Sequence, residues 1–220
     1  MKTSTLKHLT TNLALAATIT LLAGCVSKSF DKGAATSTAL QGAADAVAQT
    51  STSLYGVLGT MNNLTFKSQG DLRDQYDAFV AASKNLNQSI GHLDTAVITL
   101  QVKAAVYFND WTNQTALIQS PELRQRSTDR KAEVSSRLND VTASYESLKG
   151  SLRPFTADLT DIQTYLGTDL TSGGLATIKD VVAKTKVDAV PLRDSIKQLQ
   201  TSFGSLSAAI SPVLPTPETK

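Results

Sequence analysis

The chain has 220 residues, with 21 basic and 19 acidic side chains and a formal net charge of +2 at pH 7. This near balance argues against general nucleic-acid binding, which needs a surplus of Lys and Arg. Aromatic residues make up only 5% of the chain, and alanine, serine, threonine and leucine dominate. That composition favours a helical protein over a β-barrel or β-sandwich.

The first 24 residues are typical of a bacterial export signal. Two lysines precede an uncharged apolar stretch from Leu13 to Leu22, which is too short for a membrane span of about 20 apolar residues. Leu22-Ala23-Gly24-Cys25 then matches the lipobox of lipoproteins. We expect cleavage between Gly24 and Cys25. We also expect covalent diacylglycerol and N-acyl lipid on Cys25, whose thiol is the only one in the chain. The alternative is an ordinary signal peptide that contains a cysteine.

The segment after the cysteine bears on where the protein would reside. Val26 and Ser27 follow Cys25, with no aspartate next to the cysteine that would favour retention in the inner membrane. We therefore expect a lipid anchor in the outer membrane, with the protein facing the periplasm. The mature chain would have 196 residues (220 − 24), enough for one domain with a buried core. Residues 25–33 are expected to act as a lipidated tether.

A first helix is predicted over residues 34–66. Leu40, Val47, Leu54 and Met61 recur every seventh position, and Asp45 is the only charged residue from Ala34 to Phe66. A helix so rich in serine, threonine and alanine is weak alone and needs packing partners. It is expected to pack on the other helices, and its exchange between chains would give a homo-oligomer.

A second helix is predicted over residues 71–118, with Asp71 in its first turn. Apolar residues follow a spacing that alternates between four and three, which places them on one helix face. The first series is Leu72, Phe79, Leu86, Leu93, Leu100 and Tyr107, and the second is Tyr76, Ser83, Ile90, Val97, Ala104 and Trp111.

Two further helices are predicted over residues 121–167 and 174–210. Ser120 is the expected N-cap and Pro121 the first helical residue. The seven-residue pattern continues through Pro154 and Pro191, so we expect kinks there instead of helix ends. In residues 121–167 the two series are Val134, Val141, Leu148, Phe155 and Ile162, and Leu138, Tyr145, Leu152, Leu159 and Leu166. In residues 174–210 they are Ile178, Thr185, Leu192, Leu199 and Leu206, and Val182, Ala189, Ile196, Phe203 and Ile210. Residues 212–220 are rich in proline and are expected to form a mobile tail.

Together these elements predict an all-α fold, an elongated up-down antiparallel bundle of four long helices that spans residues 34–211. Short connections make neighbouring helices antiparallel. A strict seven-residue period predicts coiled-coil packing with left-handed supercoiling.

Several stretches in the same order resemble an uncharacterised family of bacterial lipoproteins and periplasmic proteins, known only as a domain of unknown function. These stretches are "GDLRDQYDAF", "FNDW", "SPELRQRS" and "RPFTADLTDIQTYL". The resemblance covers roughly residues 50–210. It implies long coiled-coil helices and an envelope location, without a known mechanism. The residues that carry it are Trp111, Leu123, Arg124, Ser127, Pro154, Leu159, Asp161 and Leu166.

Two groups of residues are candidates for an interaction surface. Arg124, Arg126 and Arg130 lie close together in "LRQRSTDRK", where they could meet lipid phosphates or an acidic partner. Nearby acidic residues favour an internally paired, solvated surface instead. Phe108 and Trp111 lie near the turn at Ser120 and either form a docking surface or cap the core.

Catalytic and metal-binding patterns are lacking in the sequence. His92 would be the only histidine left after signal cleavage, so a metal site is not expected. Asp158 and Asp161 lie one turn apart, but paired carboxylates need a cleft for acid–base work. We therefore predict no enzymatic activity, no catalytic residues and no small-molecule substrate. Beyond the lipid on Cys25, no cofactor is expected.

These observations lead to two functional hypotheses and a weaker third. The first is a lipid-anchored, non-enzymatic envelope protein that acts as a tether, spacer or adaptor and binds envelope proteins. The alternative is a periplasmic chaperone or an accessory subunit of an envelope complex. Apolar surface along a groove would favour the chaperone, and apolar surface at the distal tip would favour the adaptor. A polar pocket with perturbed carboxylates near Asp158 or Trp111 would favour an enzyme.

Overall fold

A computed structural model describes residues 23–68 and 70–211, with side chains from Ser29 onward. These residues form four α-helices and no strand: α1 (Ala23–Phe66), α2 (Leu72–Ala116), α3 (Pro121–Thr168) and α4 (Ser172–Ile210). Most of the expected export signal (residues 1–24) and the proline-rich tail (residues 212–220) lie outside the described residues.

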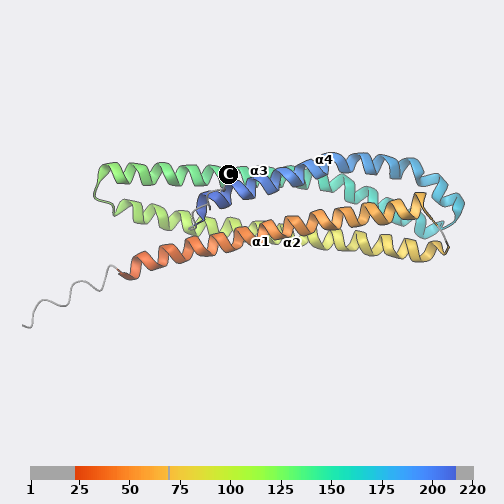
Figure 1. Cartoon of the computed structure of the whole chain (residues 1–220), viewed down its shortest axis with the longest axis horizontal. Helices are drawn as coiled ribbons and strands as arrows, with labels where there is room; N and C mark the ends of the chain where they lie inside the picture. Colours follow the sequence, from red (N-terminus) through yellow and green to blue (C-terminus); the bar gives the residue numbers. More distant parts are fainter. Residues whose placement is uncertain (1–22, 69, 212–220) are drawn as a thin grey trace, which may run out of the picture.

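The four helices run up and down along one long axis and form a closed ring of neighbours (Figure 1). α1 packs on α2 and α4, and α3 packs on α2 and α4, with no contact across either diagonal in the described part of the chain. The α1–α2 pairing is the most extensive of the four. This confirms the predicted all-α bundle. At about 1.5 Å per residue, the 45 residues of α2 span roughly 70 Å.

The core follows the predicted seven-residue pattern at most positions. In α2 the middle of the two predicted series is buried, whereas Leu72, Tyr76, Ile90, Tyr107 and Trp111 are partly exposed. In α3 and α4 nearly every position of the two predicted series is buried, and only Leu138 and Ile210 are partly exposed. The four core positions predicted in α1 are buried as well, which confirms that this serine- and threonine-rich helix is held by its neighbours. The largest fully buried side chains are Phe79, Phe155, Phe203, Leu54, Met61, Leu64, Leu86, Leu93, Leu100, Leu148, Ile162 and Leu166.

Two polar residues occupy core positions without leaving their hydroxyls unbonded. The Ser83 hydroxyl donates to the Phe79 carbonyl at 2.9 Å, and the Thr185 hydroxyl donates to the Val181 carbonyl at 3.0 Å. Such bonds to the preceding helical turn satisfy a buried hydroxyl within its own helix. Serine and threonine can therefore occupy buried positions of the seven-residue pattern.

The largest difference from the predicted helix boundaries is at the start of α1. This helix begins at Ala23, not at Ala34, so the expected tether of residues 25–33 is helical. Two contacts hold the end of this extension that adjoins residue 34. The Lys32 ammonium pairs with Asp110 of α2. The backbone of Gly33 lies against the Tyr107 ring, so that a Cβ on residue 33 would be 3.4 Å from the nearest ring carbon. The last turns of α2 thus give this segment a packing partner.

The helix ends are set by local side-chain bonds. Gly70 adopts a φ of +71° in the α1–α2 turn, a conformation that favours glycine. Asp71 then caps α2 by accepting a hydrogen bond from the Arg73 amide at 2.8 Å. Ser120 caps α3 with Pro121 in the first helical position, as predicted. Thr171 caps α4 and moves its start to Ser172 from the expected residue 174.

Both α3 and α4 continue through their internal prolines, Pro154 and Pro191, as the unbroken pattern predicted. A proline inside a helix removes one backbone hydrogen bond and crowds the preceding turn. Phe155 and Leu192, the residues that follow the two prolines, are at most 1% exposed. Burial of these apolar neighbours offsets the cost of each proline.

Replacing Gly174 with alanine is expected to destabilise the α3–α4 turn. A Cβ at this position would lie 2.1 Å from the Asp169 carbonyl oxygen, so the backbone must shift. A clash of this kind typically costs about 1–3 kcal/mol of unfolding free energy. Urea unfolding followed by circular dichroism measures the effect.

The adjacent Gly173 provides the matched control. A Cβ there would meet only the Thr171 hydroxyl oxygen at 3.5 Å, an ordinary contact. Gly173→Ala is therefore expected to be neutral or to stabilise by up to about 1 kcal/mol, because alanine is the better helix former. Equal stability of the two variants would contradict the assigned turn.

Candidate functional site

One end of the bundle gathers the residues that the sequence singled out. We call it the hairpin end. It contains the α2–α3 turn (residues 117–120), the beginning of α1 and the end of α4 (Figure 1). Contacts between Lys32 and Asp110 and between Arg130 and Ala209 bring all four helices together at this level. The opposite end holds the α1–α2 and α3–α4 turns.

A cluster of polar bonds closes the α2–α3 hairpin. The Trp111 indole donates to the Ser127 hydroxyl at 2.9 Å, and the Thr115 and Ser127 hydroxyls are 2.7 Å apart. The Lys131 ammonium donates to the Thr112 hydroxyl at 2.7 Å. Ser127 lies seven residues before Val134, the first buried residue of α3. The interface between α2 and α3 therefore continues toward the turn, with polar contacts in place of apolar ones.

Asp110 attaches α1 to α2 at the hairpin end. Its carboxylate accepts hydrogen bonds from the Lys32 ammonium and from the Ser29 hydroxyl. These two bonds hold the pKa of the Asp110 carboxyl below its usual value, and the bond from Lys32 has the larger effect. A carboxyl whose pKa is lower in the folded state stabilises that state once it is ionised. This contribution to the stability of the fold is present above the pKa that the carboxyl has in the unfolded chain. It is lost as the pH falls through the lower pKa that the carboxyl has in the folded chain.

Asp110→Asn is expected to loosen the first turns of α1, because the neutral amide no longer attracts Lys32. Backbone amides of residues 29–33 should exchange with deuterium faster at neutral pH, while amides in the middle of α1 keep their protection. Lowering the pH below the folded pKa of Asp110 should produce the same pattern in the parent chain.

The matched control is Asp140→Asn, which changes an exposed carboxylate on α3. It is expected to leave the exchange of residues 29–33 unchanged. An equal increase in exchange for both variants would show that net charge, and not the Asp110 contact, governs this segment.

The three candidate arginines all have partners within the chain. Arg124 donates to the Ile118 carbonyl through Nε and Nη2, at 3.0 and 2.7 Å, and so bridges the α2–α3 turn. Arg126 pairs with Glu122 at 2.7 Å on an exposed face. Arg130 pairs with Glu133 and also donates to the Ala209 carbonyl at 2.7 Å. A cation beside the last carbonyls of α4 favours the helix dipole.

The aromatic candidates lie partly within the bundle. Phe108 and Trp111 are half-buried and pack against the hydrophobic core. The Tyr107 ring is 5.4 Å from the Trp111 ring and 5.9 Å from the Phe108 ring. Burial raises the pKa of the Tyr107 hydroxyl. This packing favours the interpretation that the aromatic group caps the core.

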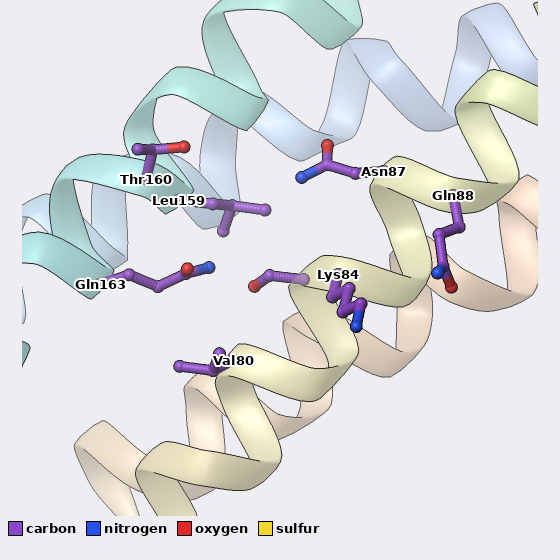
Figure 2. A pocket seen from close by; sticks show the side chains of 8 residues that line it. Val80, Lys84, Asn87, Gln88, Leu159, Thr160 and Gln163 are labelled. Atoms are coloured by element: carbon purple, nitrogen blue, oxygen red, sulfur yellow. The ribbon is translucent and has the colours of Figure 1, made fainter.

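A separate groove opens between α2 and α3, away from the hairpin end. It has a volume of about 380 Å³ and is lined by two apolar and six polar side chains. Figure 2 shows Leu159 and Gln163 of α3 pointing toward α2, with Asn87 of α2 pointing into the space between the helices. Carboxylates and histidines are lacking among the lining residues, so its chemistry is limited to hydrogen bonding and to the Lys84 ammonium.

The remaining candidate residues do not come together. His92 is exposed beside the buried Leu93. Asp158 faces α4, where it accepts a long hydrogen bond of 3.4 Å from the Thr185 hydroxyl, whereas Asp161 is exposed. Among the described residues, no three metal-ligating side chains gather in one place. None of the helices in those ranges has an apolar stretch long enough to cross a membrane. Cys25 falls in the first turn of α1, and its side chain lies outside the described residues.

Sequence reasoning missed the Asp110 contacts and the groove. Asp110 and Lys32 are 78 residues apart, and each alone is typical of a solvated helix face. The groove depends on how closely α2 and α3 approach, which no local pattern specifies. The Arg130–Ala209 contact also joins residues that are far apart in the sequence, 79 positions from each other.

Comparison with known protein families finds one that covers most of the chain. The family model described as "Protein of unknown function (DUF2959)" matches residues 31–211. This range contains every stretch on which the resemblance was based. Neither the curated proteins nor the solved structures contain a significant match.

Proposed function

The chain belongs to the family described as a protein of unknown function (DUF2959), and we propose that it is a lipid-anchored, non-enzymatic protein of the bacterial cell envelope. Its helical bundle would act as a tether, spacer or adaptor, with the anchor in the outer membrane and the bundle in the periplasm. The observation that carries the proposal is the lipobox at Cys25, which continues without a break into a rod of roughly 70 Å.

The non-enzymatic part of the proposal rests on the packing of the polar residues. The carboxylates that could act as an acid–base pair, Asp158 and Asp161, face different surroundings, and neither lines the groove between α2 and α3. The groove between α2 and α3 lacks titratable acids and bases other than Lys84. A lysine among amides and hydroxyls can bind a polar group, but it lacks the partner that acid–base catalysis needs.

The alternative, a chaperone or accessory subunit, is favoured by one surface. Ile98, Val102 and Val106 lie one turn apart on α2, and each is at least half exposed. An apolar row of this kind is a candidate surface for binding partner proteins. The groove between α2 and α3 is mostly polar and does not extend this row.

In-cell photo-crosslinking can separate the adaptor from the chaperone. Crosslinkers are introduced at Phe66, at the end opposite the hairpin end, and at Val102 in the apolar row. One reproducible partner captured from position 66 would support the adaptor, and no capture from either position would support the spacer. Many unrelated clients captured from position 102 would contradict the proposal and support the chaperone.

A further inference from the structure

The α2–α3 hairpin extends beyond the end of α4, at the end of the bundle where α1 begins (Figure 1). The last buried residue of α2 is Thr115, and the first buried residue of α3 is Val134. α4 ends at Ile210, beside Arg130, so about 10 residues of α3 project past it, a length of roughly 15 Å (Figure 1). We call residues 116–126 the hairpin tip. Its side chains have no core to pack against.

Large apolar side chains are exposed at this tip. Leu117 is 66% exposed and Leu123 is 58% exposed, on either side of the turn. Pro121 is exposed as well, and Ile118 is partly exposed. Hydrogen bonds hold the turn, because Arg124 donates to the Ile118 carbonyl and Ser120 caps α3. Two leucine side chains are thus exposed to water at the end of a hydrogen-bonded hairpin. Exposed apolar groups of this kind mark a surface that binds a partner or a membrane.

The surroundings of these leucines are positively charged. The hairpin tip contains two basic and one acidic side chain (2 − 1 = +1), whereas the chain from Cys25 onward is neutral. Segments 60–75 and 160–180, which form the turns at the opposite end, contain three basic and five acidic side chains (3 − 5 = −2). Among the described residues, no carboxylate lies within ion-pair distance of Arg124 or Lys131. Their charges thus remain available to anionic groups.

The same end of the bundle receives the chain that enters from the amino terminus. α1 begins at Ala23 at the hairpin end, and the sequence before it contains the apolar stretch that ends at Leu22 (Figure 1). A lipid on Cys25 would therefore enter a bilayer close to the hairpin tip. The opposite, acidic end would point away from that surface.

We propose that the hairpin tip is a second membrane contact, in which Leu117 and Leu123 enter the headgroup region of an anionic phospholipid surface and Arg124 meets its phosphates. This inference rests on the proposed lipid anchor at Cys25. Leucine side chains gain free energy from leaving water, and arginine suits phosphate oxygens. With contacts at the anchor and at the tip, the rod is fixed in orientation, not only in place.

The test uses the lipidated chain reconstituted in vesicles of phosphatidylethanolamine and phosphatidylglycerol. Leu117→Cys supplies the only free thiol, because the sulfur of a lipidated Cys25 is blocked, and an environment-sensitive fluorophore is attached to it. The expected result is a blue-shifted emission that is quenched by nitroxide-bearing lipids. Phe66→Cys at the opposite end is the matched control and should show neither effect. An emission from position 117 equal to that in water, with the chain still anchored, would overturn the inference.

A second measurement isolates the tip from the anchor. The mature chain with Cys25→Ser is mixed with the same vesicles, and its partition is measured by sedimentation. Adding Leu117→Ser and Leu123→Ser should lower the partition coefficient about tenfold, with helicity unchanged. Ile98→Ser with Val102→Ser, on the exposed face of α2, should leave it unchanged. Equal losses for both pairs would overturn the inference.

Other occupants and a failure of the anchor give distinct results. A blue shift at position 117 that appears without vesicles and rises with protein concentration would assign the tip to a second copy of the chain and overturn the inference. Absence of lipid on Cys25, read from the mass of the same preparation, would remove the proposed anchor. The vesicle partition of the Cys25→Ser chain would still report on the tip.

Discussion

Phe79→Ala is expected to lower the free energy of unfolding by about 3–5 kcal/mol. The Phe79 side chain is fully buried on α2 within the common core of the bundle. Alanine would leave a cavity and remove the transfer free energy of the ring. The loss is a large share of the stability of a typical domain, about 5–15 kcal/mol. Thermal unfolding followed by far-UV circular dichroism should show a midpoint lower by about 2–4 °C per kcal/mol.

Phe30→Ala is the matched control for this prediction. Phe30 is 64% exposed near the start of α1, so the same substitution removes little buried surface there. Its expected effect is within about 0.5 kcal/mol. A similar decrease in the free energy of unfolding for both variants would mean that the residues of the seven-residue pattern do not form the core as described.

Cys25→Ser is expected to release the protein from the membrane fraction of the cell. Serine has no thiol for diacylglyceryl transfer, so neither the diacylglyceryl group nor the N-acyl group would be added. Each buried CH₂ of an acyl chain contributes about 0.8 kcal/mol to membrane binding, which makes a multiply acylated anchor effectively stable. Metabolic labelling with a radioactive fatty acid and fractionation of the cells measure both effects.

Two controls accompany the cysteine variant. Ser27→Ala changes a neighbouring residue without touching the lipobox and should keep both the label and the membrane location. Continued fatty-acid labelling of Cys25→Ser would contradict the assignment of Cys25 as the acylated residue. If the unlabelled variant stayed fully membrane-bound, the hairpin tip or a partner protein would hold it there without the anchor.

The fold could be predicted from the sequence because one pattern dominates it. Series such as Val134, Val141 and Leu148 mark buried positions without reference to any distant residue, and the structure buries them. The caps at Ser120 and Thr171 act within four residues, so helix ends near them were predicted to within a few positions. Continuation of the helices through Pro154 and Pro191 could be predicted, since the apolar pattern continues on both sides of each proline.

The candidate site was harder to predict because its contacts join distant helices. Nothing near Asp110 in the sequence indicates that it pairs with Lys32, and that pairing is part of why α1 begins before residue 34. The position of the hairpin tip followed only from the lengths of α2, α3 and α4 taken together. The structure places the tip at the end of the bundle where α1 begins, although the two segments are far apart in the sequence (Figure 1).

This arrangement gives the rod two different ends. The hairpin tip is apolar and carries a net positive charge, and the turns at the opposite end carry a net negative charge. Under the proposed anchor, the basic end would face the lipid surface and the acidic end would face the periplasm. A partner protein would then meet the acidic end first, near Phe66, which is 48% exposed.

The measurement that tests the central claim most directly is the mass of the amino-terminal peptide of the protein isolated from membranes of its own cells. The expected result is a mature chain that begins at Cys25 and carries both a diacylglyceryl group on the sulfur and an acyl group on the amino nitrogen. A chain that retains residues 1–24, begins at another residue or carries an unmodified Cys25 would contradict the account of a lipid-anchored rod.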